Sequence, residues 1–182
     1  LSLTGYLVKD MVPDLAMSPD DGFLAPLCEA SRRMDLVFGF VEEMPDCGQC
    51  NSLAWLSGGK LLHVHRKLYL PTYGMFDEGR YFTRGRRMEA FDTRFGRMAM
   101  AVCEDLWHPS VPYLAFVDGA LGLVVASASP VRGVEKGELP PNSEFWQRLL
   151  AHDASLYGAF IAFANRYGVE DGISFWGGSR IL

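Results

Sequence analysis

Short apolar runs alternate with amphipathic segments through the second half of this chain, and this alternation restricts its fold more than any other feature of the sequence. Strands are predicted at 97–102, 121–127 and 159–164, and helices at 110–119 and 144–157. Such a succession is typical of layered α/β folds, in which helices cover a sheet. Pro109 suits the first turn of the first helix, and Asn142 or Ser143 can cap the second.

The first half of the chain predicts more strand than helix. Its elements are a helix at 23–34, a buried strand at 36–41 that ends at Glu42 and Glu43, and a hairpin of strands at 51–56 and 60–66. Phe91 and the strand at 97–102 flank a turn, and a further strand begins within 175–182. The segment 69–85 is predicted to be a loop rich in glycine and aromatic residues, and a long loop of this kind is usually functional.

Composition limits the partners of the chain. Its 182 residues suffice for one domain with a sizeable core. The net charge is −5 and there is no long basic run, so nucleic acid is not an expected partner. The longest apolar run, near 121–128, is too short to span a bilayer, and no secretory signal pattern opens the chain. We therefore expect a cytoplasmic protein with reduced thiols and no membrane partner.

Cys47 and Cys50 form a C-x-x-C pair, a spacing that suits half a zinc site or a redox pair. No second pair of this kind follows. His63 and His65 share one face of a predicted strand, but no further ligand accompanies them. We therefore predict no metal and no organic cofactor, and interpret Cys47 and Cys50 as incidental thiols of a loop.

Cys103 directly follows the predicted strand at 97–102, where charged residues begin. A side chain on a tight strand-to-helix turn is exposed at the edge of the sheet, close to backbone N–H groups, as a nucleophile requires. A buried, unreactive thiol is the common alternative for a free cysteine. The position of Cys103 alone leaves both interpretations open.

Lys67 ends the strand at 60–66 as Cys103 ends its own strand. Two strand ends at one sheet edge would bring the ammonium and the thiol into one cleft, where the cation favours the thiolate. A solvated surface lysine is the alternative for Lys67. The sequence therefore offers Lys67 and Cys103 as a candidate catalytic pair.

Several motifs carry a resemblance to a known family. HRKLYLP at 65–71 and YGMFDEGRYF at 73–82 resemble the lysine region of the nitrilase (carbon–nitrogen hydrolase) superfamily, and VCEDLW at 102–107 resembles its nucleophile motif. NRYGVEDG at 165–172 and FWGGS at 175–179 resemble its later strand and turn. The motifs occur in the family's order along essentially the whole chain. Two of them, YGMFDEGRYF and CEDLW, are most similar to glutaminase domains of glutamine-dependent NAD synthetases and to related stand-alone amidases.

The resemblance implies an α/β fold, a four-layer αββα sandwich, and a catalytic triad of glutamate, lysine and cysteine. On this chain Cys103 would be the nucleophile, and Lys67 would stabilise the oxyanion of the tetrahedral intermediate. Glu78 would be a further catalytic acid that positions the lysine or the substrate. The alternative for Glu78 is a loop carboxylate paired with Arg80 or Arg84.

Four more residues are candidates for substrate binding. Tyr73, Phe76 and Trp107 could form walls of the pocket, although core packing explains such aromatic residues equally well. Glu104 follows the nucleophile directly and is a fourth candidate. Glu104 and Asp105 are also expected to hold the turn after Cys103 by hydrogen bonds.

The general base is expected to lie outside this sequence. In the family it is a glutamate directly before a segment similar to LSLTGY, which is residues 1–6 here, so the residue before Leu1 would carry that role. The family also continues past the position of Leu182 into further strands. We therefore predict that 1–182 is a single, internal portion of a longer hydrolase domain, incomplete at both ends. A degenerate relative is the alternative.

Three functions are compatible with these residues. The first is a hydrolase that cleaves the amide C–N bond of a small linear substrate through a cysteine thioester. The second is a glutaminase that supplies ammonia to a synthetase, and the third is a non-catalytic interaction module. The family commonly associates through helices that would correspond to 110–119 and 144–157, so we also expect a homo-oligomer, at least a dimer.

Overall fold

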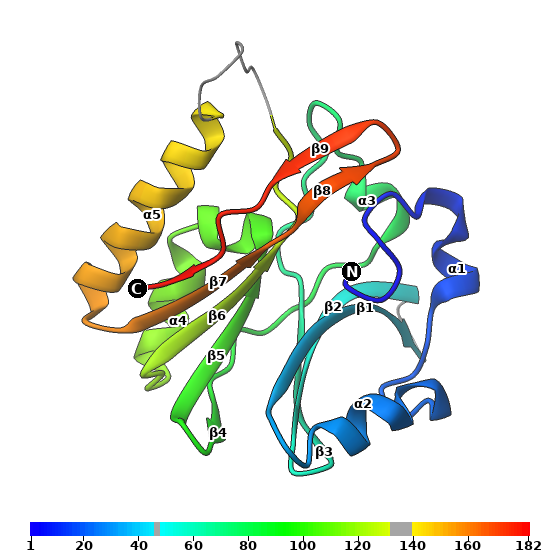
Figure 1. Ribbon diagram of the computed structural model, residues 1–182, viewed down its shortest axis with the longest axis horizontal. Helices are drawn as coiled ribbons and strands as arrows, with labels where there is room; N and C mark the ends of the chain where they lie inside the picture. Colours follow the sequence, from blue (N-terminus) through cyan, green and yellow to red (C-terminus); the bar gives the residue numbers. More distant parts are fainter. Residues whose placement is uncertain (46–47, 132–139) are drawn as a thin grey trace.

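Two β-sheets pack face to face in the computed structural model, which describes residues 1–45, 48–131 and 140–182 (Figure 1). The first sheet is antiparallel, with strands in the order β1 (Leu36–Met44), β2 (Gly48–Ser57) and β3 (Lys60–Arg66). The second has the order β10 (Arg180–Ile181), β7 (Phe160–Asn165), β6 (Gly122–Ser127), β5 (Gly96–Val102) and β4 (Phe91–Thr93). In it β5, β6 and β7 are parallel, whereas the edge strands β4 and β10 are antiparallel to their neighbours.

Helices cover the outer faces of both sheets. On the second sheet lie α4 (Ser110–Val117) and α5 (Pro141–Tyr157); on the side of the first sheet lie α1 (Val12–Leu15) and α2 (Ala25–Ala30) (Figure 1). Shorter elements connect these layers: η1 (Lys9–Met11), η2 (Gly22–Leu24), α3 (Glu78–Tyr81), η3 (Cys103–Trp107) and the hairpin of β8 (Tyr167–Glu170) and β9 (Ile173–Trp176). In the described residues the order of layers is helix, sheet, sheet, helix (Figure 1).

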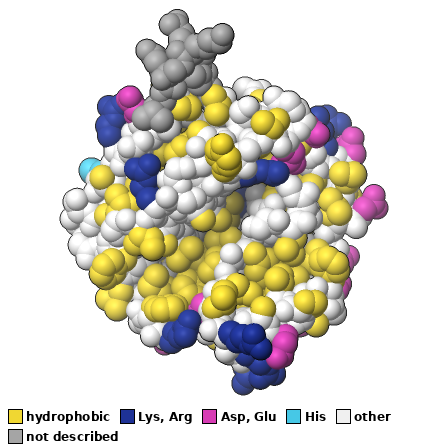
Figure 2. All heavy atoms as spheres, viewed as in Figure 1, with side chains coloured by type: hydrophobic (Ala, Val, Ile, Leu, Met, Phe, Trp, Pro, Cys, Tyr) yellow, Lys and Arg dark blue, Asp and Glu magenta, His cyan; other side chains and the backbone are white. Residues whose placement is uncertain are grey.

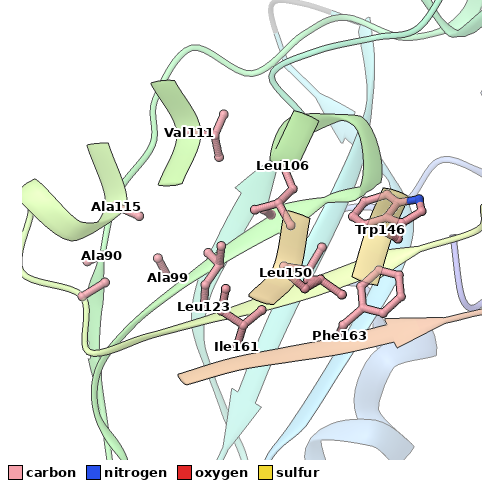
Figure 3. Packing of buried hydrophobic residues seen from close by; sticks show 13 residues of the cluster. Ala90, Ala99, Leu106, Val111, Ala115, Leu123, Trp146, Leu150, Ile161 and Phe163 are labelled. Carbon is pink, nitrogen blue, oxygen red and sulfur yellow. The ribbon is translucent and has the colours of Figure 1, made fainter. Parts of the chain in front are cut away.

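Strand alternation divides the core into layers. On β5, Ala99 and Ala101 face the helices, whereas Met100 and Val102 pack against Leu53 of β2 between the sheets. Successive side chains of a strand point to opposite faces, so one strand serves both layers. Figure 3 shows the helix-side cluster. In it the Trp146 ring of α5 stacks on Phe163 of β7, with ring centroids 4.9 Å apart.

The structure corrects two predictions in the first half of the chain. The helix predicted at 23–34 is only α2, with η2 before it, and it ends at Ala30, with Ser31 as its C-cap. The Ser31 hydroxyl accepts from the Gly59 N–H and its carbonyl accepts from Gly58, so the turn binds the tip of the β2–β3 hairpin instead of continuing the helix. The strand predicted to end at Glu42 continues to Met44, because the buried Glu42 carboxylate is paired with Arg66.

Three predictions in the rest of the chain also change. Asn142 does not cap α5, which begins at Pro141; its side-chain amide donates to Ser129 and to the Pro130 carbonyl. The single strand predicted within 175–182 is split into β9 and β10, because Gly177 and Gly178 both have positive φ. The predicted loop at 69–85 contains the short helix α3.

The predictions about the cysteine pair, a metal site and a membrane span can be compared only with the described residues. Cys47 lies outside them, and Cys50 is buried in β2. Within the described ranges, no group of three or more His, Cys, Asp or Glu side chains is arranged to hold a metal ion. In the same ranges, no helix has both the length and the apolar character needed to cross a membrane.

Candidate active site

A cavity of about 450 Å³ lies where the ends of several strands meet the first residues of the chain. Hydrophobic side chains gather in the hollow between the two sheets on the face seen in Figure 2. Polar groups come from strand ends: Lys67 after β3, Cys103 after β5, Ser127 at the end of β6, and Arg166 after β7. Mostly apolar walls with a few convergent polar groups are typical of a small-molecule site.

Cys103 sits on a strained turn at the cavity. Val102 is the last residue of β5, and η3 begins at Cys103 itself, whose φ is +46°. Non-glycine residues rarely adopt this left-handed conformation, and such strain is concentrated at functional sites. The turn breaks the alternation of the strand, so the side chain contacts both the helix-side cluster and the cluster between the sheets. The predicted strand–turn–helix context of Cys103 is therefore present.

Lys67 and Glu78 form a buried ion pair beside this turn. The Lys67 side chain is 1% exposed and that of Glu78 is 6% exposed. Lys67 Nζ donates to both carboxylate oxygens of Glu78, at 2.8 and 2.6 Å, and the Tyr6 hydroxyl donates to Oε1 at 2.9 Å. Lys67 is thus not a solvated surface lysine. It follows a strand of the first sheet whereas Cys103 follows a strand of the second, so the prediction of one shared sheet edge is wrong, and the two residues reach the same cavity because the sheets pack face to face. The Glu78 carboxylate is bound by Lys67, which removes the alternative of a surface pair with Arg80 or Arg84.

Electrostatics make Lys67 a stable cation. Burial is the largest influence and acts to lower the pKa of the ammonium, but the charge of Glu78 and its hydrogen bonds to the ammonium oppose it, and the net effect is a raised pKa. The pKa of the Tyr6 phenol is also raised, first by burial and then by the charge of Glu78, so Tyr6 remains a neutral donor. The site therefore presents a fixed positive charge at the wall of the cavity.

The Cys103 thiol is neutral at rest. Burial raises its pKa, and the opposing effects of the Lys67 charge and a hydrogen bond from Ser127 do not cancel that effect. The thiolate is the reactive form of cysteine. A nucleophilic role for Cys103 would therefore need a base that removes the thiol proton.

Asp105 holds the turn after Cys103. Its side chain is fully buried and accepts hydrogen bonds from the backbone N–H groups of Val102, Leu68 and Tyr69, and it lies 2.9 Å from His65 Nε2. These partners tie the end of β5 to the segment after Lys67. One carboxylate thus fixes the relative positions of the cysteine and lysine turns, as expected for a structural residue.

We predict that Asp105→Asn lowers the free energy of unfolding by about 3 kcal/mol at neutral pH, because an amide turns a donor toward groups that are themselves donors. Burial alone would raise the pKa of Asp105, but the hydrogen bond and charge of His65 and the Val102 N–H lower it. Its stabilisation is therefore complete above the ordinary value of 3.8 and is lost as the pH falls through the lower folded pKa. Denaturant unfolding of both proteins should show that the difference between their free energies of unfolding becomes smaller below about pH 4. A constant difference would contradict this assignment.

The four predicted substrate-binding residues lie outside the walls of the cavity, as far as the described residues define them. The Tyr73 hydroxyl donates to Glu104 Oε2 at 2.8 Å, and Phe76 packs edge-on against Tyr6 and Tyr73. Trp107 stacks on Phe145 of α5, with centroids 4.2 Å apart. The Tyr73–Glu104 contact joins the aromatic loop to η3, and substrate contact by these four residues remains a prediction.

Tyr6, Ser127 and Arg166 are among the cavity residues that were not singled out from the sequence. Tyr6 belongs to the LSLTGY segment, whereas Ser127 and Arg166 come at the ends of predicted strands. Polar residues at the carboxyl ends of neighbouring parallel strands are the available signal, because such ends meet at one edge of a sheet. That signal identifies Ser127 and Arg166 but not Tyr6, whose contact with Glu78 spans 72 positions.

A cysteine on a strained turn and a buried lysine that is paired with a glutamate line one cavity between the two sheets, and this arrangement defines a candidate cysteine-dependent hydrolase. The chain belongs to the carbon-nitrogen hydrolase family, which it matches over residues 1–182. The family predicted from the lysine and nucleophile motifs is thereby confirmed.

Named relatives give the family context. The glutamine-dependent NAD(+) synthetase of Thermotoga maritima is 29% identical over 187 residues, which cover 100% of this chain and 31% of that protein. The structure of the Acinetobacter baumannii glutamine-dependent NAD+ synthetase superposes with a TM-score of 0.81 at 27% identity, covering 97% of this chain and 32% of that one. This chain thus spans about a third of the length of these synthetases.

An amidase structure shows the same fold. The amidase of Nesterenkonia sp. AN1, in a mutant form with the acetamide moiety of fluoroacetamide added covalently at its active site cysteine, superposes with a TM-score of 0.80. The match covers 98% of this chain and 65% of that one, at 22% identity. At this identity the similarity establishes the nitrilase-like α/β fold alone.

Proposed function

We propose that this site hydrolyses the side-chain amide of glutamine through a thioester on Cys103, and that the released ammonia serves a synthetase reaction. The observation that carries this proposal is the buried Lys67–Glu78 pair, whose lysine lines the cavity of Cys103. Burying two charges costs more than it returns unless the geometry is well satisfied, so packing alone gives little reason to keep such a pair. A cation fixed beside a nucleophile is what an acyl-transfer site needs.

The first half of the proposed reaction forms the thioester. A base removes the Cys103 proton, and the sulfur attacks the amide carbon to give a tetrahedral intermediate with a negatively charged oxygen. The Lys67 ammonium and the backbone N–H after the cysteine donate to this oxygen. The C–N bond then breaks, the nitrogen takes the proton from the base, and ammonia leaves.

The second half restores the enzyme. The same base takes a proton from water, and the resulting hydroxide adds to the thioester carbon. The C–S bond then breaks to release glutamate, and the departing sulfur takes the proton back from the base to regenerate the thiol. The family's pattern gives the role of base to a glutamate directly before Leu1. Leu1 lines the same cavity as Cys103, which supports a place beside this cavity for the residue that precedes it.

Glutamine is preferred over a simple aliphatic amide as the proposed substrate. The named synthetase relatives match this chain at 29% and 27% identity, whereas the amidase structure, at 22% identity, shares only its fold. The cavity, about 450 Å³, is within the range for small-molecule ligands and suits a linear amide. The stand-alone amidase is therefore the weaker of the two proposals.

The test is ammonia release by the full-length protein, with glutamine and acetamide compared as substrates. We expect hydrolysis of glutamine, and labelling of the Cys103 peptide by an electrophilic diazoketone analogue of glutamine, with protection by glutamine itself. Hydrolysis of acetamide without glutamine would replace this proposal with a stand-alone amidase. No hydrolysis and no labelling would favour the non-catalytic module.

A homo-oligomer is proposed on the basis of exposed apolar side chains on the outer helices. On α4, Tyr113, Leu114 and Val117 are 57%, 47% and 66% exposed, and Leu156 of α5 is 61% exposed. Phe116 stacks on Tyr157, which joins the two helices into one surface. Exposed apolar patches of this kind mark association sites.

We predict at least a dimer for the full-length protein by size-exclusion chromatography with light scattering. Leu114→Glu should produce monomers, because a carboxylate cannot be buried in an apolar interface without a partner. Leu62→Glu, on an exposed residue of β3, is the matched control and should leave the assembly unchanged. A wild-type monomer would refute the prediction.

A further inference from the structure

Ser127 places a hydroxyl group beside the candidate nucleophile. It is the last residue of β6, which pairs in parallel with β5 so that Ala126 lies opposite Val102. The next residue on each strand is therefore Ser127 on β6 and Cys103 after β5. The Ser127 hydroxyl donates to Cys103 Sγ at 3.3 Å, and both side chains line the cavity.

We propose that Ser127 is a positioning residue of this site, which directs the Cys103 sulfur toward the cavity and donates a hydrogen bond to its thiolate. The inference rests on the proposed function, in which Cys103 is the nucleophile. In this role Ser127 does not contact the substrate. Ser127 holds the sulfur in one orientation and stabilises the charge that forms on it.

The charges around Cys103 give this role its importance. Lys67 faces the sulfur from the end of β3, but Glu78 of α3 binds the same ammonium through both carboxylate oxygens. Glu78 and Glu104 both disfavour a thiolate, and burial raises the pKa of the thiol further. Arg166 also lines the cavity, but Glu170 pairs with it. The Ser127 hydroxyl donates a hydrogen bond to the sulfur, and after the charge of Lys67 this bond is the next influence that lowers the pKa of Cys103.

The backbone makes Ser127 a rigid donor. Its carbonyl accepts from the Arg166 N–H at 2.9 Å, and it pairs with Asn165 in the register of β6 and β7. A donor on a paired strand loses little further freedom when it binds the sulfur, so its geometry is precise. Cys103, by contrast, occupies a strained turn, and a fixed partner restricts the orientation of its thiol.

The experiment measures the rate at which iodoacetamide alkylates Cys103 in the full-length protein as a function of pH. Mass spectrometry of the Cys103 peptide separates this site from the other three cysteines. For Ser127→Ala, the midpoint of the profile should rise by about one pH unit and the rate at neutral pH should fall about tenfold, because a hydrogen bond to a charged group is lost. The kcat for glutamine should fall by about the same factor, with KM within about twofold.

An isosteric pair separates the hydroxyl from its shape. Ser127→Thr keeps the donor and should retain the wild-type dependence of the alkylation rate on pH. Ser127→Val has nearly the shape of the threonine variant but no hydroxyl, and it should resemble the alanine variant. Alanine is smaller than serine, so at least one variant without the hydroxyl should remain folded. Equal profiles for the threonine and the hydroxyl-free variants would overturn the proposal.

Alkylation needs no turnover, so this result is independent of the proposed function. A serine-dependent profile in a protein that hydrolyses no amide would retain the role of Ser127 and reject the glutaminase. If the protein hydrolyses glutamine but the Ser127 variants alkylate Cys103 with the wild-type dependence on pH, the glutaminase proposal is retained and the role of Ser127 is rejected.

Discussion

Replacing Cys103 by alanine is expected to lower kcat for glutamine hydrolysis by about 10⁴-fold or more, because the covalent route through the thioester is removed. The residue has no comparable structural role, since it lies on a turn held by Asp105 rather than by its own side chain. Ammonia release by the purified full-length variant measures the loss. Thermal unfolding should show that the fold persists.

Cys28→Ala is the matched control for this prediction. Cys28 is a free, partly buried cysteine of α2 that packs in the outer cluster of the first sheet, away from the cavity. Its loss should leave kcat within about twofold of the wild-type value. Retained activity in Cys103→Ala, or covalent labelling at Cys28 by the glutamine analogue, would remove Cys103 from the role of nucleophile.

Replacing Lys67 by methionine should damage both stability and activity. The change leaves Glu78 buried at 6% exposure without its cation, which should lower the free energy of unfolding by about 3–5 kcal/mol. It also removes the donor to the oxyanion, so kcat should fall by at least about 10²-fold. Denaturant unfolding and ammonia release measure the two effects separately.

The double variant Lys67→Met with Glu78→Gln distinguishes these effects. Removing both charges should restore most of the lost stability, because no buried charge is left unpaired, whereas activity should remain low. Lys60→Met, on an exposed lysine at the start of β3, is the control and should change neither quantity. Recovery of activity in the double variant would show that Lys67 stabilises no oxyanion.

Some features of the fold were predictable because they depend on local sequence. The runs 97–102 and 121–127 became β5 and β6 with boundaries shifted by at most one residue, since buried parallel strands are continuous apolar segments. Glu42 shows the limit of this reasoning. Its charge predicts the end of a strand, but Arg66 on β3 and Ser52 on β2 bind the carboxylate and let β1 continue.

The sequence by itself determined the family, the α/β class and the positions of Cys103 and Lys67 at strand ends, because motifs and hydrophobic periodicity are local properties of the chain. Only the tertiary structure decided which groups meet these two residues. Tyr6 reaches Glu78, Asp105 joins the lysine and cysteine turns, and Ser127 binds the sulfur, through contacts between residues 24 to 72 positions apart. Such contacts follow from the parallel pairing of β5 with β6 and from the stacking of the two sheets, and local sequence specifies neither.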